Sequence, residues 1–250
     1  MSNYFRINSL SSLVLALFFS CNSPEKSDAI SLNQDILNAM DTIVAKLEYK
    51  PLTTKQIIPA IHKLVHGKLK VNLPESFVTD SSNVENYIQE LAITSTYAQW
   101  ASSLNLTLIK DSSLFRASNM LDLLNDESSE KKFDDLKLDT VIFRTNEFFS
   151  RDSLTYLNAY FQALSWMENF SMTLNVSRNI NNRIEYNSIL RKQLLKGDEL
   201  LAYLFDFQDY PPISEFSMQL ISILEYKYGE IDVTRLIELI TRMKSTVYYN

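Results

Sequence analysis

The chain holds only two histidines, and their spacing is the first arrangement that could do chemistry. His62 and His66 lie four residues apart, so a helix would place both imidazoles on one face, where they could share a metal ion. A zinc protease needs a glutamate directly after the first histidine, and Lys63 stands there. No Glu-x-x-His pair occurs, so the di-iron carboxylate pattern of helical bundles is absent as well. We interpret both histidines as partly exposed residues near the end of a helix, and we expect no metal or other cofactor.

One glutamate interrupts an apolar face of the segment 151–177. A stripe at helical spacing runs through Leu157, Phe161 and Leu164, and Glu168 stands where the next leucine would complete it. A carboxyl group facing the core has a raised pKa or a cationic partner, and such groups mark functional sites. We therefore consider a small-ligand pocket lined by Tyr160, Trp166, Glu168 and Asn169. The alternative is a glutamate that turns to solvent or pairs with an arginine.

The composition excludes several kinds of enzyme. The chain has 3 glycines in 250 residues, where average usage would give about 17. Dinucleotide-binding fingerprints, P-loops and nucleophile elbows all require glycine at fixed positions, so none of them is present. A Ser-His-Asp triad would have to use His62 or His66, and nothing around them suggests one. We favour a protein that is not an enzyme.

The first twenty residues read as a targeting segment. Arg6 is their only charged residue, and the apolar run from Leu13 to Phe19 is seven residues long, whereas a membrane-spanning helix needs about 20. A charged start, a short apolar stretch and a small residue before the cut are typical of a secretory signal peptide. We assign residues 1–20 to this signal and residues 21–31, which are polar and contain Pro24, to a flexible tether.

The residues at the cleavage site sharpen this assignment. Phe18-Phe19-Ser20-Cys21 resembles the lipobox of bacterial lipoproteins, especially the looser boxes of the Bacteroidetes that end in Ser-Cys. The common pattern has leucine where Phe18 stands. The resemblance implies that the signal is cut before Cys21 and that this cysteine carries the lipid. Cys21 is the only cysteine of the chain, so it cannot form an internal disulfide. The alternative is an ordinary signal peptide with a cysteine near its cleavage site.

The remaining residues, 32–250, predict an all-α domain. Apolar residues make up 46% of the chain and recur at steps of three and four residues, with no convincing strand. We expect a single irregular bundle of nine or ten helices, with Ser82 and Glu85 forming a capping box and with Gly197-Asp198 ending one helix and capping the next. The expected segments are about 31–50, 54–66, 82–100, 111–124, 140–149, 151–177, 178–196, 214–228 and 232–246.

Charge and anchoring together indicate a class of function. Removal of Arg6 with the signal changes the net charge from −6 to −7, which does not suit nucleic acid or an anionic membrane surface as a partner. By analogy with enteric lipoproteins, Asn22 after the cysteine implies the outer membrane, facing the periplasm, while display on the cell surface stays open. We expect an envelope lipoprotein whose helical body binds an envelope protein or acts as a scaffold. The alternative is a small-ligand-binding protein or enzyme that uses a pocket around Glu168.

Overall fold

The computed structural model describes residues 54–65, 71, 73–76, 78, 83–125, 137–150 and 154–249, all within the unit Glu48–Asn250. This part of the chain is all-helical, as predicted, and its only β pairing is an isolated bridge between Val65 and Ile180. It contains eight α-helices: α3 (Thr54–Leu64), α4 (Val84–Ser103), α5 (Thr107–Asn125), α6 (Leu138–Phe149), α7 (Thr155–Asn175), α8 (Arg183–Leu204), α9 (Pro211–Leu224) and α10 (Val233–Tyr249). The segments expected to be a signal peptide (1–20), a tether (21–31) and a first helix (31–50) lie outside the described residues.

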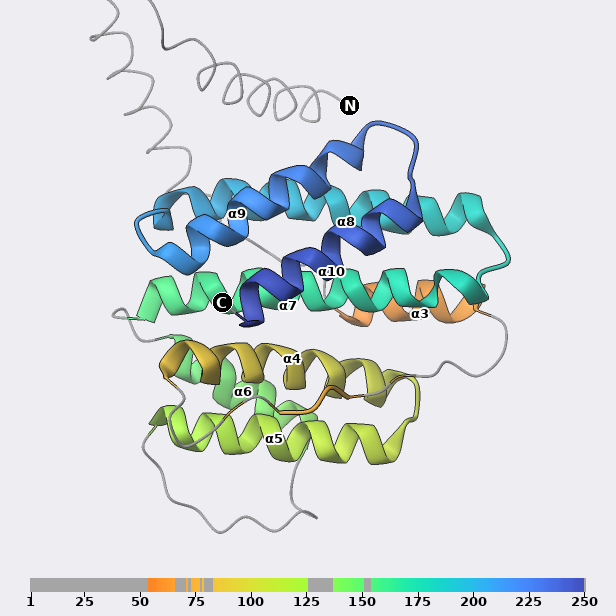
Figure 1. Ribbon diagram of the computed structural model, residues 1–250. Coiled ribbons are helices and arrows are strands. Elements are labelled where there is room, and N and C mark those ends of the chain that lie inside the picture. The colour runs from red at the N-terminus through yellow and green to blue at the C-terminus, as the bar shows by residue number, and fades with distance from the viewer. Residues whose placement is uncertain are drawn as a thin grey trace, which may run out of the picture. The chain divides into compact units, whose positions relative to one another are not determined.

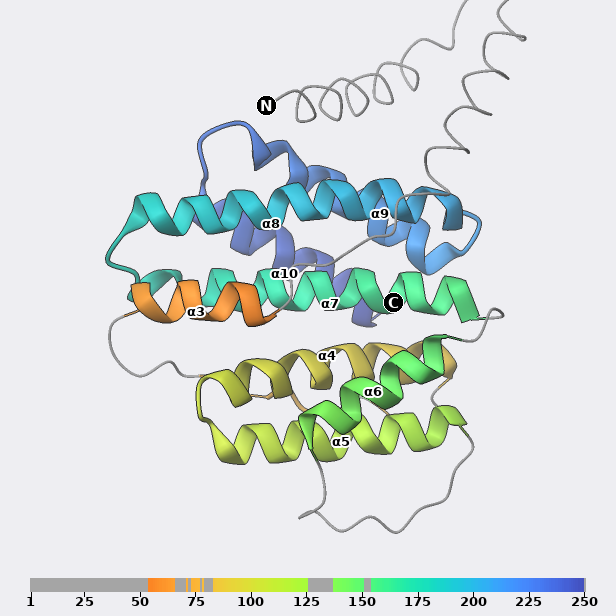
Figure 2. The same ribbon diagram turned by 180° about the vertical axis from the view of Figure 1, so that it is seen from behind.

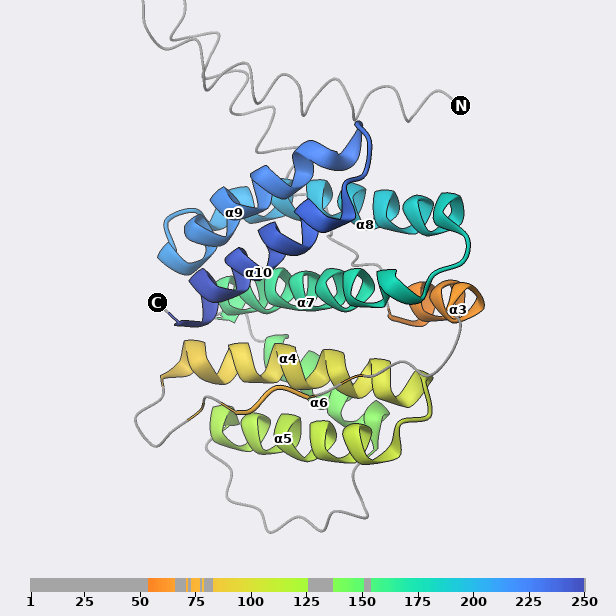
Figure 3. The same ribbon diagram turned by 45° about the vertical axis from the view of Figure 1, so that its right-hand side comes forward.

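Helix α7 lies at the centre of the described bundle (Figure 1). It packs against α4 on one side and against α8, α9 and α10 on the other, an arrangement that the turned view in Figure 3 repeats. Its buried residues lie on nearly every face, which is the pattern of a helix enclosed by its neighbours. The sequence predicted a helix here, over 151–177. Seen from behind, α5 lies on the side of α4 that faces away from α7 and α8, and α6 crosses in front of α4 and α5 and also contacts α7 (Figure 2).

Helix α4 separates α5 from α7 and is buried without interruption from Ile88 to Ala98. Several of these residues are polar, so their groups need partners inside the protein. The Thr94 hydroxyl donates to the Glu90 carbonyl at 2.7 Å, and the Ser95 hydroxyl donates to the Leu91 carbonyl in the same way. These bonds stay within the helix, so α4 can be enclosed on both sides despite its polar sequence.

Helix α4 begins one residue later than expected. Asn83, not Ser82, is its N-cap: the Asn83 side chain accepts from the Asn86 backbone at 3.0 Å, and the Asn86 side chain accepts from the Asn83 backbone at 3.0 Å. Asparagine and serine are comparably good N-caps. The reciprocal bond decides the start of the helix, and here a second asparagine supplies it in place of Glu85.

The break predicted at Gly197-Asp198 was wrong, because α8 continues through both residues. Gly197 is buried where α8 crosses α7. A Cβ atom at this position would lie 2.7 Å from Trp166 Cζ2 and 3.0 Å from Leu224 Cδ2, closer than carbon atoms pack in proteins. The glycine therefore makes room for the indole ring of a neighbouring helix, and its role is packing rather than helix termination.

Candidate functional site

The carboxylate of Glu168 lies completely buried in the middle of α7. Two side chains of α10 neutralise it: Lys244 Nζ donates to Oε2 at 2.8 Å, and the Tyr248 hydroxyl donates to Oε1 at 2.6 Å. Lys244 and Tyr248 are four residues apart, so they lie one above the other on a single helix face. Glu168 therefore has the cationic partner that a buried carboxylate requires, and this partner is a lysine 76 residues away in the sequence.

The tyrosine hydroxyls near Glu168 stay protonated at neutral pH. Burial raises the pKa of Tyr248 well above its usual value, and the charge of Glu168 and the hydrogen bond to it raise this pKa further. Burial also raises the pKa of Tyr97 on α4, and the charge of Glu168 adds to that effect. Because Glu168 is completely buried, a substrate cannot reach either of its oxygens to transfer a proton to them. The geometry suits a carboxylate that stabilises the packing of α7 against α10 better than one that acts as a general base.

A second buried polar contact to α7 lies at Tyr160, two turns before Glu168, and it is made by Gln89 of α4. Gln89 of α4 is 6% exposed, and its Nε2 donates to the Tyr160 hydroxyl and to the Val247 carbonyl, both at 2.9 Å. The other amide atom, Oε1, is buried and has no hydrogen-bond partner among the described residues. Burial raises the pKa of Tyr160 to about 12, with the Gln89 hydrogen bond opposing the rise and the charges of Glu85 and Glu215 adding to it. Tyr160 is therefore a neutral phenol at physiological pH.

Tyrosine rings and carboxylates gather where α4, α7 and α9 begin. The Tyr210 hydroxyl donates to Glu85 Oε1 at 2.8 Å. The Tyr210 ring meets the rings of Tyr156 and Tyr160 edge to face, with centroids 4.9 Å and 6.0 Å apart, the arrangement that aromatic quadrupoles prefer. Burial raises the pKa of Tyr210 above its usual value, and the bond to Glu85 and its charge raise it further.

Two of the four residues predicted to line a pocket point away from Glu168. Trp166 faces α8, where its Nε1 donates to the Gln193 carbonyl at 3.1 Å. Asn169 faces α4, where its Oδ1 accepts from Trp100 Nε1 at 3.0 Å. The other two, Glu168 and Tyr160, both face the junction of α7 with α4 and α10. The predicted residues therefore do not line one common site, since Trp166 bonds to α8 and Asn169 bonds to α4.

The remaining chemical candidates lie largely outside the described part of the chain. His62 belongs to α3, but its side chain, like the whole of His66 and Cys21, is outside the described residues. Among the residues that the structure does describe, no group of three or more His, Cys, Asp or Glu could hold a metal ion. None of the described helices combines the length and apolarity needed to cross a bilayer.

Sequence reasoning missed Gln89, Lys244 and Tyr248, which complete the surroundings of Glu168 and Tyr160. One signal was present: Lys244 and Tyr248 have the four-residue spacing of a shared helix face. Tyr248 lay beyond the helix end expected at 246, which concealed the pair. The separation of 158 residues between Gln89 and Val247 left no local signal at all.

Comparison of this chain with known protein families, with curated proteins and with solved structures finds no match.

Proposed function

We propose that this chain is an envelope lipoprotein, anchored by lipid on Cys21, whose helical body binds or organises other envelope components without catalysis. The proposal places the protein at the outer membrane, facing the periplasm. A body of bundled helices on a short polar tether suits this role, because the tether holds the body near the membrane and leaves its surface available.

The observation that carries the anchor is the position of Cys21. It follows directly on Ser20 at the end of a seven-residue apolar run, and it is the only cysteine in the chain. A triacylated cysteine supplies two or more acyl chains, which is what stable anchoring requires.

The surroundings of Glu168 support a binding role over a catalytic one. An acid or base catalyst needs a proton-accepting atom that a substrate can reach. Glu168 is completely buried, and its oxygens accept hydrogen bonds from Lys244 and Tyr248 of α10. The one carboxylate that the sequence pattern singled out is thus neutralised by the protein itself.

Membrane fractionation combined with intact mass measurement tests the anchor in a Gram-negative host. We expect the wild type to sediment with the outer membrane and to carry the mass of a lipid, and Cys21→Ala to be soluble or uncleaved. Ser23→Ala is the matched control and should behave as the wild type. If the wild type and Cys21→Ala are both soluble and are cut at the same place, the protein is secreted without a lipid and the proposal fails.

A small-ligand binder with a site around Glu168 and Tyr160 is the second candidate function. The observation that favours it is the buried Gln89 Oε1, an acceptor that lacks a donor among the described residues beside Tyr160. Native mass spectrometry of protein purified from its envelope tests this candidate. A retained small molecule that Gln89→Leu releases would support it, and a bare protein mass for both forms would count against it.

A further inference from the structure

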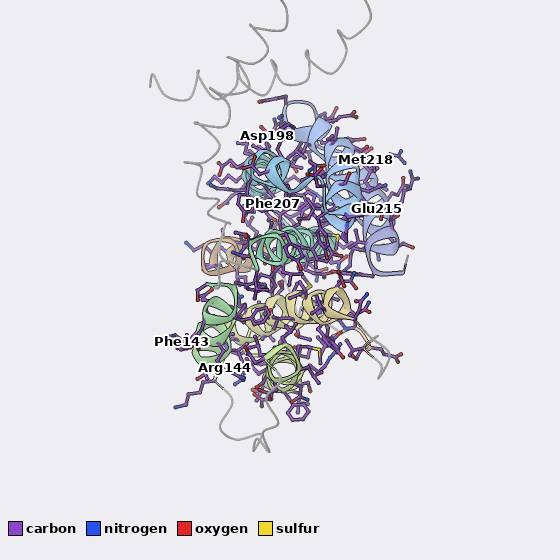
Figure 4. The ribbon with its side chains drawn as sticks, turned by 90° about the vertical axis from the view of Figure 1, so that its left-hand side faces the viewer. Phe143, Arg144, Asp198, Phe207, Glu215 and Met218 are labelled. Carbon is purple, nitrogen blue, oxygen red and sulfur yellow. The ribbon has the colours of Figure 1, made fainter. Side chains whose placement is uncertain are left out.

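One end of the described bundle combines aromatic rings with carboxylates. Helices α4, α7 and α9 begin at this end, and α10 finishes there, since the Val247 carbonyl bonds to Gln89 in the second turn of α4 (Figure 1). Figure 4 views the molecule from this side and labels Glu215 on α9 and Phe207 just before it. We name the surface made by Glu85, Tyr156, Tyr210 and Glu215 the tyrosine end; the buried Tyr160 packs against Tyr210 beneath it.

The carboxylates of the tyrosine end lack a cationic partner among the described residues. Glu85 and Glu215 are both half-buried, and both act on the Tyr160 hydroxyl, so two helices bring their charges to the same place. Among the described residues, the side-chain donor that Glu85 has is the neutral Tyr210 hydroxyl. Lys244, the basic residue nearest the end of α10, is committed to Glu168. Half-buried charges without a counter-charge favour the approach of a cation.

Helix dipoles compensate only part of this charge. Glu85 lies in the first turn of α4, where the partial positive charge of the helix start stabilises it. Glu215 is the fifth residue of α9, beyond the first turn in which the dipole acts. The uncompensated part therefore lies mainly on Glu215, next to the tyrosine rings.

The rings suit a cation as well. Tyr156 is 39% exposed, and its ring packs edge to face on Tyr210. A phenol ring presents partial negative charge on its face, and an ammonium or guanidinium group within about 6 Å of the centroid is attracted to it. Tyr160 is 2% exposed, so the ring area within reach of a cation belongs to Tyr156 and to the half-buried Tyr210.

An independent observation points to a hydrogen-bond donor from outside. Gln89 lies one turn after Glu85 on the same face of α4 and bonds to Tyr160 beneath the surface. Its Oε1 is buried with no donor among the described residues. Native proteins rarely leave such an acceptor unpaired, since it costs about as much as a lost hydrogen bond. A bound ammonium or guanidinium group, directly or through a water, would supply the donor.

We infer that the tyrosine end binds a lysine- or arginine-containing segment of a partner protein. This inference rests on the proposed function, because it names the surface and the partner chemistry of the binding body. The acidic net charge of −6 adds long-range attraction for a basic partner. The segment would place a cationic side chain beside Glu215 and Tyr156.

Peptide binding to the full-length protein in phosphatidylcholine nanodiscs tests the inference. The probe is a fluorescent hexalysine peptide, measured by anisotropy at moderate salt, with a hexaglutamate peptide as the reference. We expect hexalysine alone to bind, and Glu85→Gln with Glu215→Gln to weaken its Kd about tenfold. Tyr156→Ala, which keeps the charge, should weaken it about threefold.

A matched pair of substitutions separates this surface from general attraction. Glu199 and Glu238 are 47% and 56% exposed on other parts of the bundle, so Glu199→Gln with Glu238→Gln removes the same charge elsewhere. We expect this control to change the Kd by less than twofold. An equal loss in both double variants, or no binding of hexalysine by the wild type, would overturn the inference.

Crosslinking in cells then tests the surface apart from the anchor. A photoreactive amino acid replaces Tyr156, and the crosslinked peptide is sequenced by mass spectrometry. A crosslink to a segment that contains lysine or arginine, lost in Glu85→Gln with Glu215→Gln, is the expected result. A partner crosslinked through a neutral or acidic segment would overturn the inference and leave the proposed binding function standing. Absence of lipid on Cys21 would overturn the anchor alone.

Discussion

Lys244→Met is the substitution that most directly tests the buried charge at Glu168. It removes the ammonium group and leaves the carboxylate with the Tyr248 hydroxyl as its remaining donor. Removing one partner of a buried ion pair costs about 3–5 kcal/mol, because the other charge stays in the interior without compensation. The Lys244 side chain is 24% exposed whereas that of Glu168 is 0% exposed. Since water reaches the lysine end of the pair, we expect a loss near the lower limit, about 3 kcal/mol.

Glu168→Met and the double variant complete a double-mutant cycle. In Glu168→Met the lysine can turn toward solvent, and the main cost is the Tyr248 hydroxyl that loses its acceptor, about 1–3 kcal/mol. The double variant places two methionines side by side and contains no buried charge. We therefore expect it to be no less stable than Lys244→Met alone, which gives a coupling energy of about 2 kcal/mol.

Urea unfolding at pH 7, followed by circular dichroism on chains that begin at residue 22, measures all four free energies. Unchanged denaturant slopes are needed for the comparison, since a changed slope would mean that the unfolded or native ensemble had changed. A Lys244→Met variant whose unfolding free energy lies within about 1 kcal/mol of the wild type would refute the reasoning, because a buried carboxylate without its counter-charge destabilises the protein by more than that. Strict additivity of the two single substitutions would refute it as well.

Two further predictions follow from packing and from ionisation. Gly197→Ala should lower the unfolding free energy by about 1–2 kcal/mol in urea, because overpacking against Trp166 outweighs the helix propensity of alanine. Gly229→Ala, whose Cβ would meet nothing within 4 Å, is the control and should change it by less than about 0.5 kcal/mol. Tyr160 keeps its proton to about pH 12 in the folded protein, so its contribution is intact below pH 10 and is lost as the pH rises from 10 to 12. Tyr160→Phe should reduce the loss over that interval by at most about 2.7 kcal/mol, and parallel stability curves would contradict this assignment.

The helices could be predicted from the sequence because their signals are local. The central helix α7 has apolar residues at three- and four-residue steps, which predicted a helix over 151–177. The start of α9 was expected at 214, but the helix begins at Pro211, because proline is well accommodated in the first turn of a helix. The burial of Glu168 could also be predicted as one of two alternatives. A glutamate on an apolar stripe either turns its side chain to solvent or is buried beside a cationic partner. The structure selects the second outcome.

The partners of these residues were beyond sequence reasoning, because tertiary packing chooses them. Twenty-four basic residues could have paired with Glu168, and only the crossing of α10 over α7 selects Lys244. Gly197 shows the same limit, because here a local signal was present and tertiary packing overrode it. A glycine followed by an aspartate has the local signature of a helix end and a new cap, but the indole of Trp166 fills the space beside it and the helix continues.

Exposure separates the residues that hold the fold from those that can meet a partner. Glu168 is 0% exposed and fully bonded, so changing it alters stability and cannot report on binding. Glu85 and Glu215 are half-buried on the surface above, and their removal leaves no buried group without its charge partner. Because Gln89 donates to the Tyr160 hydroxyl and to the Val247 carbonyl of α10, a partner at the tyrosine end would also tighten the contact between α4 and α10. Protection of α10 amides from hydrogen exchange should therefore rise when hexalysine binds. Unchanged protection would mean that binding at the tyrosine end is not coupled to the contact between α4 and α10.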